Sequence, residues 1–177
     1  MNYANMIKYD IANGPGIRTS LFVSGCDFHC EDCFNQEAQD FSYGKRFDGV
    51  ALRTLMEYVS DPKVDGLSIL GGDPLCQAED GLLRMIDICH RVQDLGKSTW
   101  LWSGYTWEQI FSTVVLDQLD VCRELRRELI ENVDVFIDGQ FDKTKKDLRL
   151  RYCGSSNQRV IDVKKSLAKG ELVLWTR

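Results

Sequence analysis

The segment Thr19-Ser-Leu-Phe-Val-Ser-Gly-Cys-Asp-Phe-His-Cys-Glu-Asp-Cys33 runs from a short apolar stretch directly into three closely spaced cysteines. Its first six residues are rich in β-branched and aromatic side chains and are followed by glycine, which is typical of a buried strand that ends in a turn. Three other short apolar stretches have glycine close after them and are also predicted as strands: Gly66–Leu70, Ser98–Trp102 and Val133–Ile137.

Segments with helical periodicity separate these strands. Apolar residues between positions 52 and 59 recur at offsets of 0, 3, 4 and 7, and residues 82–93 and 116–131 are similarly one-sided. This alternation predicts an α/β fold with a mostly parallel sheet, in which right-handed crossovers bring the carboxyl ends of the strands to one edge. Two segments near the end of the chain indicate one or two more short strands: Arg159–Val163 and Leu172–Trp175.

Length and composition indicate one globular domain that spans residues 1–177. The net charge of −5 lacks the positive excess that binding to nucleic acid requires, so nucleic acid is excluded as a primary partner. The chain has no cationic start followed by an apolar run and no stretch of about eighteen apolar residues, so we expect no membrane segment and a cytoplasmic location. Seven cysteines without an export signal favour metal ligation or redox chemistry over disulfides.

Cys26, Cys30 and Cys33 form the pattern C-x3-C-x2-C. A 4Fe-4S cluster is usually held by four cysteines, so a loop that supplies three leaves one iron free to bind a substrate. The three thiols are therefore the candidate ligands of a cluster with one open iron.

A zinc site is the alternative for the same loop. Structural zinc sites prefer two separated cysteine pairs, and the sequence contains no second pair. His29 offers a fourth ligand, but it directly precedes Cys30, which makes tetrahedral ligation by both awkward.

The C-x3-C-x2-C pattern is the cluster motif of the radical S-adenosylmethionine superfamily, which this chain resembles. Within that superfamily it is most similar to the activating proteins of glycyl-radical enzymes, above all to those of anaerobic ribonucleoside-triphosphate reductase. Four further segments carry the resemblance, in the family's order: Asn13–Arg18, Cys33–Asn35, Gly71–Leu75 and Gly154–Asp162. Two positions depart from the wider superfamily, since Asp32 replaces a residue that is often aromatic and Asp73 replaces the glutamate of Gly-Gly-Glu.

The resemblance implies an oxidoreductase that uses a 4Fe-4S cluster and S-adenosylmethionine as cofactors. An external low-potential donor such as flavodoxin or ferredoxin would reduce the cluster. The resulting 5′-deoxyadenosyl radical would take a hydrogen atom from a glycine of the large subunit of anaerobic ribonucleoside-triphosphate reductase and leave a glycyl radical. Because a complete eight-unit barrel needs ~250 residues, we expect an open partial (β/α) barrel of the radical S-adenosylmethionine type.

Three alternatives remain at this point. Two are enzymes, namely an activating protein of another glycyl-radical enzyme and a radical S-adenosylmethionine enzyme that acts on a small molecule. The third is a zinc or iron-sulfur binding module without catalysis.

The same resemblance assigns S-adenosylmethionine binding to the ends of three strands. Gly71, Gly72 and Asp73 would accept hydrogen bonds from the ammonium group of the cofactor, although a strand-to-helix turn capped by Asp73 explains these residues as well. Ser103 and Asp138 are candidates for lining the adenosine pocket, and Asp138 is equally suited to capping a turn.

Three basic residues are candidates for contact with the partner protein. Lys145 and Lys146 belong to the one locally basic segment, residues 142–151, and Arg18 lies within the Asn13–Arg18 motif. A solvated loop and an ordinary salt bridge are the alternatives. Of the other cysteines, Cys89 and Cys122 are predicted to be core residues, and the spacing of Cys76 and Cys153 does not make them ligands.

Overall fold

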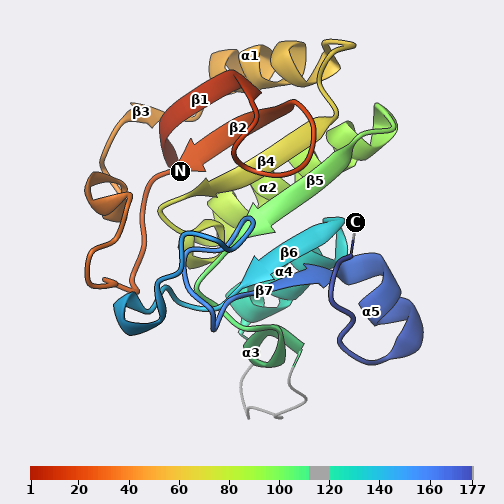
Figure 1. The fold of residues 1–177 in the computed structure, drawn as a ribbon. Coiled ribbons are helices and arrows are strands. Elements are labelled where there is room, and N and C mark those ends of the chain that lie inside the picture. Colours follow the sequence, from red (N-terminus) through yellow and green to blue (C-terminus); the bar gives the residue numbers. More distant parts are fainter. Residues whose placement is uncertain (112–119, 177) are drawn as a thin grey trace.

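The computed structural model describes residues 1–111 and 120–176. Within these residues the chain forms a seven-stranded mixed sheet with the order β3-β1-β2-β4-β5-β6-β7 (Figure 1). The strands are β1 Asn2–Asp10, β2 Arg18–Val23, β3 Lys45–Arg46, β4 Gly66–Gly71, β5 Ser98–Trp102, β6 Val135–Asp138 and β7 Arg159–Asp162. The α-helices are α1 Gly49–Ser60, α2 Glu79–Asp94, α3 Trp107–Phe111, α4 Val121–Glu131 and α5 Val163–Lys169.

The four central strands confirm the predicted parallel arrangement. β2, β4, β5 and β6 pair in parallel, so their carboxyl ends lie at one edge, and in Figure 1 their arrowheads point to the same side. The outer strands pair antiparallel, which the sequence did not indicate. The sheet is therefore mixed and open rather than a closed parallel barrel.

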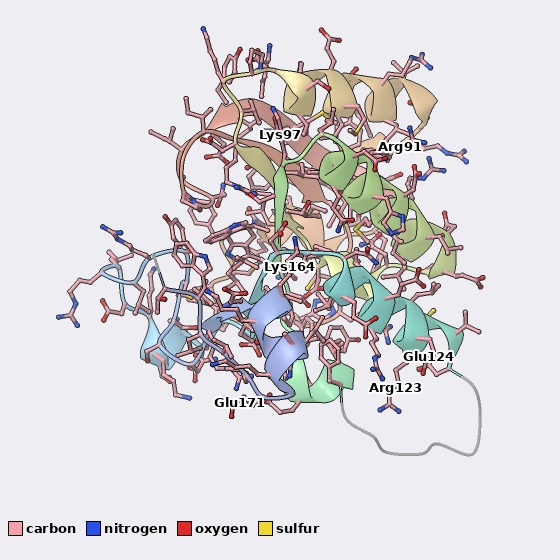
Figure 2. All side chains as sticks on the ribbon, turned by 90° about the vertical axis from the view of Figure 1, so that its right-hand side faces the viewer. Arg91, Lys97, Arg123, Glu124, Lys164 and Glu171 are labelled. Atoms are coloured by element: carbon pink, nitrogen blue, oxygen red, sulfur yellow. The ribbon has the colours of Figure 1, made fainter. Side chains whose placement is uncertain are left out.

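Helices cover one face of the sheet. α1, α2 and α4 pack there on apolar residues that alternate along the central strands, such as Leu21, Ile69 and Leu101. Figure 2 shows these helices on one side of the molecule, with Arg91 of α2 and Glu124 of α4 at the outer surface. Asp48 caps α1 and Asp120 caps α4 by accepting backbone N–H bonds, which explains where both helices begin.

The opposite face carries a smaller apolar cluster. Trp100, Val135 and Ile137 form it together with Tyr152 and Trp175. The C-terminal segment thus packs across the sheet, where Leu174 forms an isolated bridge with Ile161 rather than the predicted strand at 172–175. The periodic segment 116–131 becomes α4 only from Val121, and residues 116–119 lie outside the described residues.

Three short 3-10 helices complete the description. They are η1 Gln36–Gln39, η2 Pro74–Cys76 and η3 Lys143–Lys145. Among the described residues, no helix has both the length and the apolar character that spanning a bilayer requires.

Candidate functional site

The ends of β2 and β4 are joined by backbone hydrogen bonds that continue beyond the strands. The Gly72 N–H donates to the Val23 carbonyl at 2.8 Å, and the Asp73 N–H donates to the Gly25 carbonyl at 2.7 Å. The start of the cysteine loop, residues 24–35, is therefore held directly against the Gly71–Asp73 segment. The topology brings these two predicted site segments together.

The cysteine loop turns sharply at two residues that are not glycine. His29 and Asp32 have φ values of 48° and 56°, and the Cys33 N–H closes a turn on the Cys30 carbonyl at 3.2 Å. The Cys26 N–H is fixed to the Gln39 carbonyl at 3.0 Å, so the loop is anchored before its first thiol.

The three thiols of the loop differ in burial and interact with one another. Cys26 is buried, whereas Cys30 and Cys33 are half-buried. Burial raises the pKa of Cys30, and the neighbouring charges of Cys33 and Cys26 raise it further. A cation that binds all three would remove this repulsion, so the donor set suits a thiophilic metal centre.

The His29 ring contacts a glutamine, whereas the His29 backbone N–H interacts with the Cys26 thiol and lowers the pKa of Cys26. The Nδ1 atom of His29 lies 3.2 Å from Oε1 of Gln39 on η1. This contact ties the ring to the segment that follows the cysteines.

Gly71 and Gly72 lie so close to neighbouring backbone atoms that no larger residue fits at either position. Gly71 has a φ of 114°, and a Cβ atom there would lie 2.5 Å from the Val23 carbonyl oxygen. A Cβ atom at Gly72 would lie 2.5 Å from the Ala38 oxygen and 2.6 Å from the Gly25 oxygen. The two glycines thus permit the cysteine loop and β4 to touch. The Gly71 carbonyl accepts a hydrogen bond from the Asn35 side chain at 3.1 Å, so it already has one donor.

Asp73 lies buried between the ends of β4 and β5. Its carboxylate accepts hydrogen bonds from the Leu75 N–H and the Gly104 N–H, both at 2.7 Å, and from the Ser103 hydroxyl at 2.9 Å. Burial raises the pKa of Asp73 to about 6, although these hydrogen bonds oppose the shift. The sequence offered two roles for this residue, and the capping role is present, since Asp73 caps η2.

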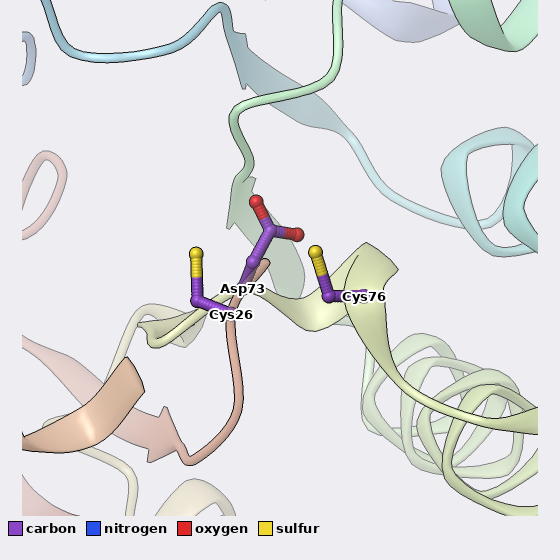
Figure 3. A group of neighbouring side chains, drawn as sticks. All are labelled: Cys26, Asp73 and Cys76. Atoms are coloured by element: carbon purple, nitrogen blue, oxygen red, sulfur yellow. The ribbon is translucent and has the colours of Figure 1, made fainter. Parts of the chain in front are cut away.

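Cys76 joins this site, which the spacing of the cysteines did not predict. The Sγ atoms of Cys26 and Cys76 and a carboxylate oxygen of Asp73 all lie within 4.8 Å of one another (Figure 3). A hydrogen bond from the Cys76 thiol lowers the pKa of Cys26, and the same contact together with burial raises the pKa of Cys76. A local signal for the proximity of Asp73 and Cys76 is present in the sequence. In a 3-10 helix, residues three apart lie on the same side, and these two residues have this spacing around η2.

Asp138 is buried but its carboxylate is already paired. It contacts the guanidinium group of Arg159 on β7 and accepts the Trp107 N–H at 2.8 Å at the start of α3. Arg159 also binds Glu108 at 2.7 Å, and both contacts raise the pKa of Arg159. The sequence identified Asp138 at its strand end but not the arginine that neutralises it.

Arg18 lies at the opposite edge of the sheet, at the beginning of β2. Its side chain is 1% exposed and donates hydrogen bonds to Ser68 Oγ at 2.8 Å, to the Leu67 carbonyl at 2.7 Å and to Ser98. Burial lowers its pKa to about 10. The expectation that Arg18 contacts a partner is corrected on this ground, because its guanidinium group is enclosed between three strands.

The basic segment, residues 142–151, contacts the cysteine loop. Lys143 of η3 forms salt bridges with Glu31 and Asp32 of the loop, both at 2.9 Å, and the Gln140 side chain donates to the Phe28 carbonyl at 3.0 Å. Lys145 and Lys146 are exposed, and Lys145 pairs with Asp142 at 2.9 Å. Sequence reasoning missed Lys143, which is the lysine that contacts the loop.

One surface pocket does not include the predicted thiol ligands. Its lining is formed by Met1, Asn2, Phe41, Arg46, Gln77, Ala78 and Asp80. Gln77 lines this pocket, and its side-chain amide donates to the Ser24 carbonyl at 3.0 Å and to the Asp73 carbonyl at 3.1 Å. The thiols and Asp73, rather than this pocket, mark the candidate site.

Comparison with known proteins supports an iron-sulfur interpretation of this geometry. Residues 12–161 match the family described as a 4Fe-4S single cluster domain. The chain is 33% identical over 162 residues to the anaerobic ribonucleoside-triphosphate reductase-activating protein of Pasteurella multocida strain Pm70, which covers 89% of this chain and 95% of that protein.

Two further proteins of the same name show similar agreement. The protein from Haemophilus influenzae is 35% identical over 161 residues, with 89% of this chain and 96% of that protein covered. The protein from enterobacteria phage T4 is 32% identical over 160 residues, with 90% and 93% covered. The chain therefore belongs to the family of anaerobic ribonucleoside-triphosphate reductase-activating proteins and contains a 4Fe-4S single cluster domain.

Proposed function

We propose that this protein is the activating enzyme of an anaerobic ribonucleoside-triphosphate reductase and generates the glycyl radical of that enzyme. The observation that carries the proposal is the site itself: one loop carries three thiols, and the first of them, Cys26, lies beside the buried Asp73 carboxylate at the carboxyl edge of the sheet. Family membership over nearly the whole chain supports the same reductase as the target.

The three thiols of the loop fit a 4Fe-4S cluster with one iron free of protein ligands. Cys26, Cys30 and Cys33 would hold the cluster, and the mutual repulsion of their charges would be relieved by the bound metal. When bound, the reduced cluster and S-adenosylmethionine together supply a 5′-deoxyadenosyl radical that removes a hydrogen atom from the target glycine.

Asp73 is the proposed acceptor for the ammonium group of S-adenosylmethionine. Within the described residues no lysine, arginine or histidine forms a salt bridge with its carboxylate, so a cationic ligand would compensate a buried charge. Gly71 and Gly72 let the backbone approach the same space, and Ser103 holds the carboxylate in place. Asp138, which is neutralised by Arg159, would fix the start of α3 beside the adenosine side of the pocket rather than bind the cofactor charge.

The surface around the cysteine loop is the proposed contact for the reductase. Phe34, which directly follows the last thiol, is fully exposed. Lys145 and Lys146 are exposed on the basic segment that contacts the loop through Lys143. The open sheet supports a partial barrel of the radical S-adenosylmethionine type, with residues 1–177 as one domain. Its open side would admit a glycine-bearing segment of another protein.

Electron supply and location complete the proposal. A low-potential donor such as flavodoxin or ferredoxin would reduce the cluster. Seven free cysteines, three of them grouped for metal binding, support the cytoplasm, where thiols stay reduced.

Anaerobic reconstitution tests the function directly. The protein is loaded with iron and sulfide, reduced with dithionite and incubated with S-adenosylmethionine and the reductase, after which 5′-deoxyadenosine is measured by chromatography. A glycine-centred doublet in electron paramagnetic resonance spectra of the reductase is expected. 5′-Deoxyadenosine without that doublet would favour another substrate, and the absence of both would refute the enzyme proposal.

A pair of cysteine variants provides the matched control. Cys30→Ala should lose the cluster and the cleavage of S-adenosylmethionine together. Cys89→Ala removes a thiol that is fully buried in the helix-side core, so it should lower stability by about 1 kcal/mol and leave the iron content unchanged. Equal loss of iron in both variants would show that the ligands are misassigned.

A further inference from the structure

Cys76 gives the site a second set of metal-binding atoms that differs from the cysteine loop. This set, the Cys26–Asp73–Cys76 group, consists of three buried residues. The two thiol sulfur atoms and a carboxylate oxygen lie within 4.8 Å of one another. In Figure 3 the two sulfur atoms stand on either side of the Asp73 carboxylate. Cys30 and Cys33 do not belong to this group and are more exposed.

The Asp73 carboxylate is a buried anion whose partners are all neutral. It accepts hydrogen bonds from the Leu75 N–H, the Ser103 hydroxyl and the Gly104 N–H, and the Cys76 N–H also lowers its pKa. Within residues 1–111 and 120–176 it carries no salt bridge, so its charge has no cation beside it.

The composition of the group selects the kind of ion. Two thiolates and a carboxylate oxygen are ligands that Zn²⁺ accepts in tetrahedral sites, whereas Mg²⁺ and Ca²⁺ take oxygen ligands. A set of three protein ligands leaves the fourth position of the tetrahedron to water.

We propose that, in the chain without its cluster, the Cys26–Asp73–Cys76 group binds one thiophilic divalent cation such as Zn²⁺ through two thiolates and one carboxylate oxygen. Binding forms two metal–sulfur bonds and one metal–oxygen bond and releases the two thiol protons to solvent, without any change of oxidation state. The positive ion compensates the buried Asp73 charge, which has no cationic partner in the part of the chain that the structure describes.

The site has a consequence for the cysteine loop because Cys26 belongs to both sets. A thiolate bound to a single ion at this group is not available to a cluster, so the two metal centres exclude each other. Occupation by Zn²⁺ would hold the chain in a form that takes up iron and sulfide slowly.

Cobalt titration under anaerobic conditions tests the proposal, with Co²⁺ as a visible substitute for Zn²⁺. The cluster-free full-length chain should bind one equivalent and show a thiolate-to-cobalt charge-transfer band with tetrahedral d–d bands. The double variant Cys30→Ala, Cys33→Ala should retain the band and the affinity within about twofold, because it keeps the whole group. Cys76→Ser should weaken binding at least about tenfold.

Controls separate ligand loss from unfolding. Far-ultraviolet circular dichroism checks that each variant is folded, and Cys76→Ala provides a second substitution at the same position. Cys89→Ala removes another buried thiol and should bind Co²⁺ as the parent chain does. Loss of the band in the Cys30→Ala, Cys33→Ala variant would place the ion on the loop and overturn the proposal, as would parent-like binding by Cys76→Ser or no binding by the parent chain.

A second measurement tests the exclusion and rests on the proposed function. The Zn²⁺-loaded chain should incorporate a 4Fe-4S cluster more slowly than the metal-free chain, and Cys76→Ser should remove that difference. Failure to form any cluster would refute the proposed function, whereas the cobalt result would stand on its own.

Discussion

The Ser103 hydroxyl lies 2.9 Å from both carboxylate oxygens of Asp73, although the two residues end different strands. This contact connects the Gly-Gly-Asp segment after β4 with the end of β5. Through this contact the Ser103 hydroxyl orients the buried carboxylate.

Replacement of Ser103 should therefore reduce cofactor affinity through Asp73. Ser103→Ala removes one hydrogen bond to a buried charged group and should weaken S-adenosylmethionine binding to the reconstituted protein about tenfold. Isothermal titration calorimetry under anaerobic conditions measures this change. Ser156→Ala, at an exposed position, is the control, and equal affinity in both variants would contradict the role assigned to Ser103.

The pKa of Asp73 predicts an unusual dependence of stability on pH. Because burial raises this pKa from 3.8 to about 6, the folded chain binds a proton that the unfolded chain releases between those values. Asp73 should therefore lower stability at pH 7, and this effect should disappear as the pH falls through 6 toward 4. Its full size is roughly 3 kcal/mol, from about two pKa units.

Comparison with Asp73→Asn isolates that effect from other carboxyl groups. Urea unfolding of the cluster-free chains should show the parent gaining stability relative to the variant as the pH falls from 7 to 4. Parallel curves for the two proteins over this range would show that Asp73 has an ordinary pKa.

Substitution of Gly72 by alanine should disturb the site more than the same substitution at Gly49, the first residue of α1. Gly72→Ala places a methyl group 2.5 Å from the Ala38 oxygen, so we expect a loss of about 1–3 kcal/mol and poor cluster retention. At Gly49 the nearest atom would lie 3.8 Å away, so Gly49→Ala should be neutral. Thermal unfolding and iron content measure both variants, and a stable Gly72→Ala that retains its iron would contradict the packing argument.

Arg18 should behave as a structural residue. Arg18→Met leaves the Leu67 and Ser98 carbonyls without their donor and should lower stability by about 3 kcal/mol. Chemical unfolding of the cluster-free chain measures the loss. Unchanged stability combined with weaker reductase binding would restore the surface role that the sequence suggested.

The exposed lysines should act on the partner alone. Lys145→Glu together with Lys146→Glu should slow association with the reductase and leave 5′-deoxyadenosine formation without reductase unchanged, because rim charges act mainly on the rate of encounter. Surface plasmon resonance at two salt concentrations measures this effect. Arg53→Glu with Lys63→Glu makes the same change in charge around α1, and an equal decrease in that variant would show an effect of net charge only.

The central fold could be predicted because its signals are local. Ser98–Trp102 is found with the predicted bounds, and the other central strands differ from their predicted ranges by one or two residues. β1 was missed because its residues lack an apolar or β-branched run, and its position depends on pairing with β2. The antiparallel outer pairs are likewise a property of the assembled sheet.

The candidate site likewise has parts that the sequence predicts and parts that it does not. The cysteine spacing and the two glycines are local patterns, and the structure brings them together. The burial of Arg18 and the contact between Cys26 and Cys76 depend on segments about fifty or more residues apart, which no local pattern contains. An arginine is usually exposed, so its burial follows only when Ser68 and Ser98 are in place.

The short strand β3 has a consequence for the behaviour of the protein at high concentration. An open sheet has two borders at which another chain can add a strand and start aggregation. At one border β3 contains only Lys45 and Arg46, both exposed and charged. At the other, the C-terminal segment covers β7, with the Asp162 N–H bonded to Val173 at 2.9 Å. Within the described residues, β3 pairs only with Asn2 and Tyr3 of β1, so the border at β1 stays open to an added strand from Ala4 onward, whereas the border at β7 is covered.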